Sequence, residues 1–280
     1  MNEKISFDEN VAPLPVNLKQ AEVPRINFAE RNCPTTIYEA HELIEKALKD
    51  QPESPVSWSG GKCSTVVLHM ALQINPDIRV IFNDTGIEFP ETYEFIDYIV
   101  DEWGVNLRKL RPKTTFWTCV KKYGFPQIRG RYQSTKRPHG KDGRPMCCQL
   151  LKEAPLLEAR IPSTITGLRV AESRARVFGI AQRGQYYYAK TLKRWNWHPI
   201  AFWTEEQCWK YHHDFHIPHN KIYNMGHFRC GCWPCTGYLS WQKYLSVSHP
   251  AMYKALMKKK GTPTLWEYDE GGCPLVEVEE

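Results

Sequence analysis

The chain has 280 residues, 42% of them hydrophobic, which is enough for one large domain or two small ones with an ordinary core. No stretch approaches the roughly 20 consecutive apolar residues of a membrane span, and the first residues lack the apolar core of a signal peptide. We therefore expect a globular cytoplasmic protein without membrane contact, and the net charge of +6 favours an anionic ligand.

The first 34 residues include four prolines and little apolar periodicity, so we expect an arm there. Beyond it, apolar spacing and the positions of proline and glycine predict alternating helices and strands. In chain order, these are a helix at 36–50, a strand at 55–58, a helix at 64–74, a strand at 78–84, a helix at 90–103, a strand at 106–110, a helix at 147–159, a strand at 163–169 and a helix at 204–215. The last helix should begin with a capping box, in which Thr204 is the N-cap and Gln207 its partner.

Alternating strands and helices predict an α/β fold with a doubly wound, mainly parallel sheet. We expect three parts: an N-terminal extension over 1–34, a nucleotide-binding domain over 35–242 and an irregular C-terminal tail over 243–280. In open parallel sheets, ligands bind outside the carboxyl ends of the strands. Polar residues at those ends are therefore the first candidates for a site.

The segment SWSGGKCSTVV, at residues 57–67, reads as a strand end, a glycine turn and the start of a helix. Glycines let the backbone turn tightly and bring bare N–H groups to a phosphate, and the helix N-terminus adds its positive dipole end. The predicted phosphate-binding residues are Ser59, Gly60, Gly61, Lys62 and Ser64. Cys63 stands among them as a second redox thiol or as a small packing residue.

Two more strand ends should face the same crevice. One is NDTG at 83–86, which offers Asp84, Thr85 and Gly86, and the other is TGLR at 166–169, which offers Gly167 and Arg169. Glu172, Arg174 and Arg176 follow closely. Three polar strand ends on one rim favour a nucleotide ligand over ordinary strand-to-helix turns.

The cysteines gather in two places. Cys147 and Cys148 are adjacent, and Cys232 and Cys235 form a CxxC pair that follows Cys230. Four thiolates in two tight pairs are what a 4Fe–4S cluster or a structural zinc ion needs, whereas a CxxC pair alone can be a redox dithiol. Cys119 and Cys208 lie in apparently helical stretches, and we expect them to be buried.

The ordered set SGGKCS, NDTGIEFPETYEFI, CCQLLKEAP, ITGLRVAESRAR, HPIAFWTEEQCWKYHHDFHIPHNKIYNMGH and GCWPCT resembles the sulfonucleotide reductases. This family comprises the adenylyl-sulfate and phosphoadenylyl-sulfate reductases, and the ATP-pyrophosphatases are its relatives. The resemblance covers roughly residues 36–238 and implies an adenine nucleotide α-hydrolase-like fold. The branch with an iron–sulfur cluster is the most similar.

The resemblance also implies roles for individual residues. Cys147, Cys148, Cys232 and Cys235 would bind a 4Fe–4S cluster, and Lys152 would lie near the cluster and the substrate. A cysteine thiolate would attack the sulfate sulfur of adenylyl sulfate or phosphoadenylyl sulfate, and a thioredoxin-like dithiol would then release sulfite. Cys273 lies nearly where the family has this nucleophile, although its surroundings, GGCPL, lack the family's glutamate and histidine.

Two other functions stay open at this stage. The loop SGGK is also close to that of ATP-pyrophosphatases, some of which adenylate tRNA or DNA before inserting sulfur, and the basic segment 129–144 would then face the nucleic acid. Cys63 stands where those relatives have aspartate, which weakens the ATP-cleaving hypothesis. The other possibility is a non-catalytic module that binds nucleic acid and is stabilised by a metal. A homo-oligomer is possible in each case.

Overall fold

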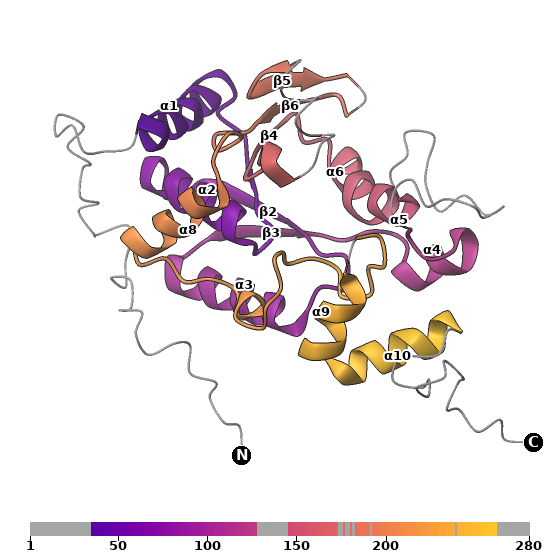
Figure 1. Cartoon of the computed structure of the whole chain (residues 1–280). Coiled ribbons are helices and arrows are strands. Elements are labelled where there is room, and N and C mark those ends of the chain that lie inside the picture. The colour runs from indigo at the N-terminus through magenta and orange to yellow at the C-terminus, as the bar shows by residue number, and fades with distance from the viewer. Residues whose placement is uncertain are drawn as a thin grey trace, which may run out of the picture.

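The computed structural model describes residues 35–127, 145–172, 183–190, 192–238 and 240–261, together with residues 176 and 180. A six-stranded sheet forms the centre of the molecule, in the order β3-β2-β1-β4-β6-β5 (Figure 1). The strands are β1 (Val56–Ser57), β2 (Arg79–Asn83), β3 (Asn106–Leu110), β4 (Ser163–Thr166), β5 (Tyr186–Ala189) and β6 (Arg194–Trp197). Every neighbouring pair is parallel except β5 and β6, which confirms the expected mainly parallel sheet.

The helices flank this sheet and continue beyond it. They are α1 (Thr35–Asp50), α2 (Lys62–Ile74), α3 (Pro90–Trp103), α4 (Phe116–Tyr123), α5 (Met146–Cys148), α6 (Ala154–Glu158), α8 (Glu205–Asp214), α9 (Trp241–Ser248) and α10 (Pro250–Lys260). The short turns are the π-helix η1 (Gln149–Glu153) and the 3-10 helices η2 (Val170–Glu172) and η3 (Lys221–Tyr223). None of the described helices is long and apolar enough to cross a membrane.

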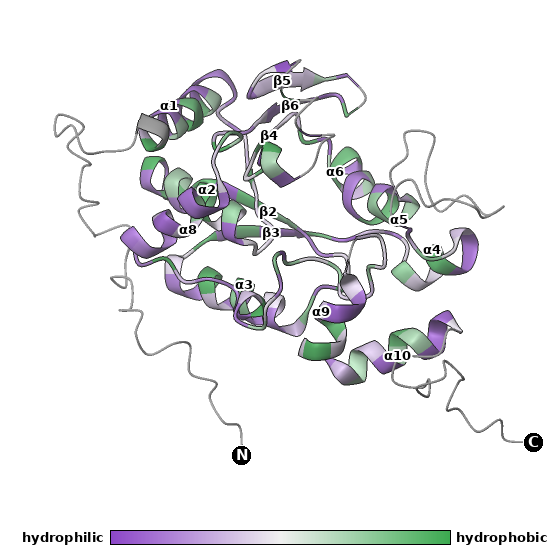
Figure 2. Ribbon diagram, viewed as in Figure 1, coloured by the Kyte–Doolittle hydropathy of each residue, from purple (hydrophilic) through white to green (hydrophobic). Residues whose placement is uncertain are grey.

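The two faces of the sheet bury different sets of side chains. Val80 and Phe82 of β2 pack in the main core with residues of α1, α2, α3 and α8, whereas Ile81 between them packs with Leu110 and Leu156 of α6. This alternation follows from the period of two in a strand. It fits a sheet with helices on both faces, and Figure 2 shows apolar stretches alternating with polar ones along α3.

The element carrying the glycine loop is held firmly. Eleven of the 13 residues of α2 are buried, since the helix lies between the sheet and α8. The predicted capping box of α8 is present: Thr204 accepts a hydrogen bond from the Gln207 amide, and the Gln207 side chain accepts one from the Thr204 amide. The loop before α2 is therefore held in place by a buried helix that packs against a well-capped one.

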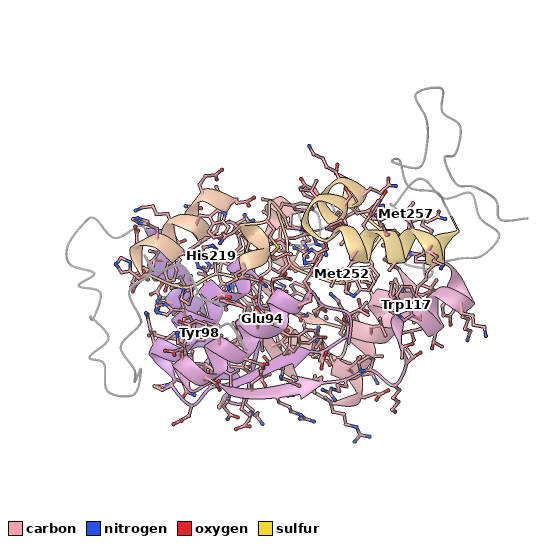
Figure 3. All side chains as sticks on the ribbon, turned by 90° about the horizontal axis from the view of Figure 1, so that it is seen from below. Glu94, Tyr98, Trp117, His219, Met252 and Met257 are labelled. Atoms are coloured by element: carbon pink, nitrogen blue, oxygen red, sulfur yellow. The ribbon has the colours of Figure 1, made fainter. Side chains whose placement is uncertain are left out.

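The structure differs from the sequence prediction in two regions. The helix expected over 147–159 is divided by the π-helix η1, and part of the expected irregular tail is helical, because α9 and α10 lie at 241–260. Leu245 and Leu256 bury themselves with Phe89 and Ile222 in a second core. Met257 of α10 belongs to the same core, and Met252 and Trp117 pack against it; Figure 3 labels these three residues. The arm over 1–34 and residues 262–280 lie outside the described residues.

Acid should destabilise this fold before its carboxylates titrate. Burial lowers the pKa of His69 from 6.5 to about 3 and that of His198 to about 4. Between pH 6.5 and these values, the unfolded chain binds protons that the folded chain does not, so stability falls as the pH falls. The expected loss is about 1.4 kcal/mol per pH unit for each histidine.

Urea denaturation at pH 7.5 and 5.5 measures this loss. His69→Gln should reduce the difference between the two midpoints, whereas His213→Gln, which changes an exposed histidine, should leave it as in the parent protein. An unchanged difference in His69→Gln would contradict the assignment to His69.

Candidate functional site

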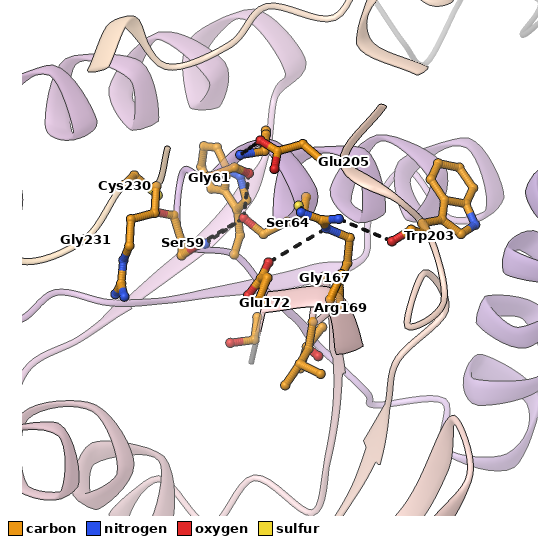
Figure 4. A pocket seen from close by; sticks show the side chains of 18 of the residues that line it. Ser59, Gly61, Ser64, Gly167, Arg169, Glu172, Trp203, Glu205, Cys230 and Gly231 are labelled. Carbon is orange, nitrogen blue, oxygen red and sulfur yellow. Dashed lines mark hydrogen bonds and ion pairs between the residues drawn. The ribbon is translucent and has the colours of Figure 1, made fainter. Parts of the chain in front are cut away.

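A cavity of about 900 Å³ opens beside the turn after β1 and the end of β4 (Figure 4). Its lining includes several residues that the sequence predicts for nucleotide binding: Ser59, Gly61, Lys62, Ser64, Gly167, Arg169 and Arg176. These residues come from segments more than 100 positions apart, which the parallel sheet brings together. The cavity lies where open parallel sheets bind their ligands.

Glycine is needed at three positions around this cavity. Gly60 has a φ of +70°, a left-handed conformation that side chains other than glycine's rarely adopt. A Cβ on Gly61 would lie 2.7 Å from the Cys230 sulfur, and one on Gly167 would lie 2.5 Å from the Cys63 carbonyl oxygen. The close approach of the Cys230 sulfur to Gly61, and of the Cys63 backbone to Gly167, explains why these two positions are glycine.

Hydrogen bonds fix the shape of the glycine loop. The Ser64 hydroxyl donates to the Gly61 carbonyl at 2.9 Å and accepts from the Ser59 amide at 3.2 Å. The Lys62 amide donates to the Tyr223 hydroxyl at 3.1 Å. These hydrogen bonds hold the loop in one conformation. The Lys62 amide, which the sequence predicts as a phosphate donor, donates to the Tyr223 hydroxyl instead.

The Lys62 side chain is also held by partners. Its ammonium donates to the Phe228 carbonyl at 2.9 Å, pairs with Glu205 at 3.0 Å and lies 4.6 Å from the centre of the Tyr223 ring. The roles of Glu205, Tyr223 and Phe228 were not predicted. Glu205 and Tyr223 lie within the quoted segment HPIAFWTEEQCWKYHHDFHIPHNKIYNMGH, but its sequence does not show that they meet Lys62. They surround a lysine that is 5% exposed, so its charge is held at the cavity wall.

Arg169 is a second buried cation of the site, with 3% of its surface exposed. Its Nε donates to the Cys63 sulfur at 3.1 Å, and its Nη1 donates to the Trp203 carbonyl at 3.2 Å. The Arg169 Nε also lies 3.8 Å from a carboxylate oxygen of Glu172, an ion pair that Figure 4 marks with a dashed line. Glu172 pairs with Arg176 as well. These contacts hold the guanidinium in one orientation beside the cavity.

Asp84, Thr85 and Gly86 do not line the cavity. Asp84 accepts hydrogen bonds from the Tyr93 hydroxyl at 2.8 Å and from the Gly86 amide at 3.1 Å, and it pairs with Arg111. These contacts organise the turn after β2. Their nucleotide-binding role stays a prediction from the sequence.

The turn after β2 contacts the segment that carries Cys232 and Cys235. Thr85 donates to the buried carboxylate of Glu88 at 2.8 Å, and the Cys232 thiol lies 3.9 Å from the same carboxylate. The Trp233 amide donates to the Ile87 carbonyl at 3.0 Å. Glu88 also lines the cavity, so this turn joins the cavity to the cysteines.

The structure gathers Cys147, Cys148, Cys232 and Cys235 from two distant segments. Burial raises the pKa of Cys232 to about 12, and the hydrogen bond with Cys148, burial and the charges of the other three thiols raise the pKa of Cys147. Within the part of the chain that is described, no three His, Cys, Asp or Glu side chains converge on a single metal ion. A 4Fe–4S cluster presents its four irons at separate points, so it needs four neighbouring thiols rather than a group that converges on one ion, and the thiols that act on Cys147 fit this donor chemistry.

Lys152 lies between these cysteines and the cavity. The nearby Cys232 sulfur raises the pKa of Lys152, with Glu88 and Cys148 adding to the effect against the cost of burial. Lys152 also lines the cavity. The resemblance implies that this lysine lies near a cluster and a substrate; the structure places it beside the cysteines and at the cavity wall, and its role stays a prediction. Cys273 and most of the basic segment 129–144 lie outside the described residues.

The expected burial of Cys119 and Cys208 is confirmed, since they are 2% and 0% exposed, and Cys63 is also buried, at 7%. Cys63 and Cys208 are neighbours. The Cys208 thiol, through its hydrogen bond to the Cys63 sulfur, lowers the pKa of Cys63 to about 6, with help from the Arg169 charge and against the effect of burial. The sequence could not reveal this pair, since 145 positions separate the two residues.

Known proteins are similar to this chain in sequence. An adenosine 5'-phosphosulfate reductase of Staphylococcus epidermidis is 29% identical over 219 residues, which are 76% of this chain and 82% of the relative. A phosphoadenosine 5'-phosphosulfate reductase of Xylella fastidiosa is 33% identical over 194 residues, which are 66% of this chain and 73% of the relative.

The fold has a solved counterpart in a phosphate complex of the phosphoadenylyl-sulfate reductase of Candida auris, with a TM-score of 0.52 and 20% identity over 70% of this chain and 88% of that one. The family model of the phosphoadenosine phosphosulfate reductase domain matches residues 53–238, which carry the glycine loop, Arg169 and all four paired cysteines. The chain therefore belongs to the phosphoadenosine phosphosulfate reductase domain family.

Proposed function

We propose that this protein reduces a sulfonucleotide, adenylyl sulfate or phosphoadenylyl sulfate, to sulfite and the corresponding nucleotide. The observation that carries the proposal is the cavity itself, which joins a glycine loop and the buried Arg169 to Lys152 beside four cysteines. Family membership supports an oxidoreductase that acts on a sulfur group.

The chemistry of the cavity suits an anionic ligand. Lys62, Lys152, Arg169, Arg176 and Arg229 line it, against the carboxylates Glu88, Glu172, Glu205 and Glu206. Arg169 is fixed by its contacts, and the preformed loop presents small residues that let a phosphate approach the backbone. These features would bind and orient the phosphate and sulfate groups of the substrate.

We further propose that Cys147, Cys148, Cys232 and Cys235 hold a 4Fe–4S cluster. Four thiols around a shared space are the donor set that such a cluster requires. When bound, the cluster would supply a charged and polarisable inorganic group that tunes the charge near the substrate. Lys152, which lies beside Cys232 and lines the cavity, would hold its positive charge between the cysteines and the substrate's sulfate.

We propose that Cys273, which follows Cys235 in the sequence, is the nucleophile. Its thiolate would attack the sulfate sulfur, so that an S–S bond forms, the S–O bond to the nucleotide's phosphate breaks and AMP or its 3'-phosphate leaves. The enzyme would then carry an S-sulfonated cysteine. A thioredoxin-like dithiol in the cytoplasm would attack the cysteine sulfur, release sulfite and finally form its own disulfide.

The test is an assay of the protein purified and reconstituted without oxygen. Adenylyl sulfate, phosphoadenylyl sulfate and ATP are each supplied with thioredoxin, and sulfite and pyrophosphate are measured. Sulfite from either sulfonucleotide supports the proposal, and the ratio of the two kcat/KM values identifies the substrate. Pyrophosphate from ATP without sulfite from either compound would overturn it in favour of an ATP-pyrophosphatase.

Arg169→Lys should weaken AMP binding by about 10-fold, because a lysine cannot reproduce the fixed fork of a guanidinium. Isothermal titration of both proteins with AMP measures the change. Arg79→Lys is the matched control, since Arg79 is exposed and pairs with Glu53 at the surface. Equal affinities for AMP in Arg169→Lys and the parent protein would remove Arg169 from the binding site.

A further inference from the structure

The proposed reaction makes no use of two buried thiols that meet at the cavity wall. Cys63 lies in the first turn of α2, and Cys208 lies in α8, which packs against α2. Both residues belong to the main core, and each thiol shifts the pKa of the other, so the two sulfurs are neighbours. Cys63 also lines the cavity, whereas Cys208 lies behind it with no exposed surface.

The surroundings of Cys63 stabilise a negatively charged sulfur. Arg169 donates to this sulfur at 3.1 Å, the Lys62 charge acts in the same direction, and the residue stands at the N-terminal end of a 13-residue helix. Thiolates with such neighbours react readily with oxidants. Cys208 contributes the second requirement of a redox pair, a thiol within reach of the first.

We propose that Cys63 and Cys208 form a redox-active dithiol at the wall of the cavity, which hydrogen peroxide converts into a disulfide. The Cys63 thiolate attacks one peroxide oxygen, the O–O bond breaks, and the hydroxide that leaves becomes water with a proton from the medium. Cys208 then attacks the sulfur of the resulting sulfenic acid, an S–S bond forms, and a second water leaves. Two thiols and one peroxide thus give one disulfide and two waters.

The disulfide would change the charge next to Arg169. In the reduced protein, the Cys63 thiolate partly neutralises the guanidinium, and in the oxidised protein the sulfur is uncharged. An anionic ligand would then meet one fewer negative charge, which should tighten AMP binding by about threefold for a separation of several ångströms in a hydrated site. A bound nucleotide would in turn cover Cys63 and slow its oxidation. These two effects rest on the proposed function, but disulfide formation does not.

The experiment oxidises the full chain, purified with its metal content intact, with one equivalent of hydrogen peroxide in the absence and presence of AMP. Remaining thiols are alkylated, and peptide mass spectrometry measures the Cys63–Cys208 cross-link. We expect the cross-link in most chains, formation at least fivefold slower with saturating AMP, and threefold tighter AMP binding afterwards. Treatment with dithiothreitol should restore the starting affinity.

Two variants distinguish the Cys63–Cys208 disulfide from oxidation of other thiols. Cys208→Ala should raise the pKa of Cys63, so we expect its AMP affinity to lie between those of the reduced and the oxidised parent protein, and peroxide should form no disulfide at Cys63. Cys119→Ala removes a buried thiol elsewhere and should still form the cross-link. Absence of the Cys63–Cys208 cross-link in the parent protein overturns the proposal, whatever the reductase assay gives. A cross-link in a protein that binds no AMP would support the dithiol and contradict the nucleotide site.

Discussion

Cys273→Ser should lower the rate of sulfite release from adenylyl sulfate at least about 1,000-fold, because a serine hydroxyl at neutral pH is a far weaker nucleophile than a thiolate. The variant should keep its AMP affinity, since the cavity residues stay in place. Mass spectrometry of the parent protein, incubated with substrate but without reductant, should find one added SO₃ group on the peptide that contains Cys273. The variant should lack this adduct.

Cys33→Ser is the matched control for this variant, because Cys33 belongs to the N-terminal arm that the sequence excludes from the domain. It should react at the rate of the parent protein. An SO₃ adduct that persists in Cys273→Ser on another cysteine would disprove the assignment of the nucleophile, while reduction of the sulfonucleotide itself would still stand.

Cys232→Ser should lose most of the iron, from about four atoms per chain to fewer than about two, and its visible absorbance should fall accordingly. We expect at least a 100-fold loss of reductase activity, because the neighbours of Lys152 would change with the ligand. Iron analysis of anaerobically reconstituted protein, together with the absorbance spectrum, measures the result.

Cys230→Ser controls for the loss of any thiol from this segment. Cys230 contacts Gly61 and lies two positions before the proposed ligand, so its replacement should leave the iron content unchanged. One zinc and no iron in the parent protein would overturn the cluster assignment. Iron retained in full by Cys232→Ser would remove Cys232 from the ligand set.

Much of the fold could be predicted from sequence, because the strands and helices around the glycine loop have strong periodicity. The helix over 90–103 is predicted by apolar spacing and by a proline in its first turn, and α3 has these bounds. The π-helix η1 could not be predicted, because its residues fit an ordinary helix equally well. α9 and α10 were not predicted, because these short helices are separated by His249 and Pro250 and are stabilised by packing in the second core, which a single sequence does not show.

The candidate site was predictable only where a local motif marks it. Gly61 and Arg169 stand at strand ends and could be identified, whereas Tyr223 and Glu205 reach the cavity wall and Lys62 only through the fold. Asp84, at another strand end, organises a turn, and its nucleotide-binding role stays a prediction. Residues that act through long-range contacts carry no signal in a single sequence.

The three residues from Cys230 to Cys232 connect the two halves of the site. The Cys230 sulfur packs over Gly61, and Cys232 lies beside Glu88, with only Gly231 between them. A backbone shift at one of these cysteines therefore needs to cross only one residue to reach the other. Assembly of the cysteine centre and readiness of the glycine loop should be thermodynamically linked, so that the protein matures into a nucleotide-binding form only when both are complete.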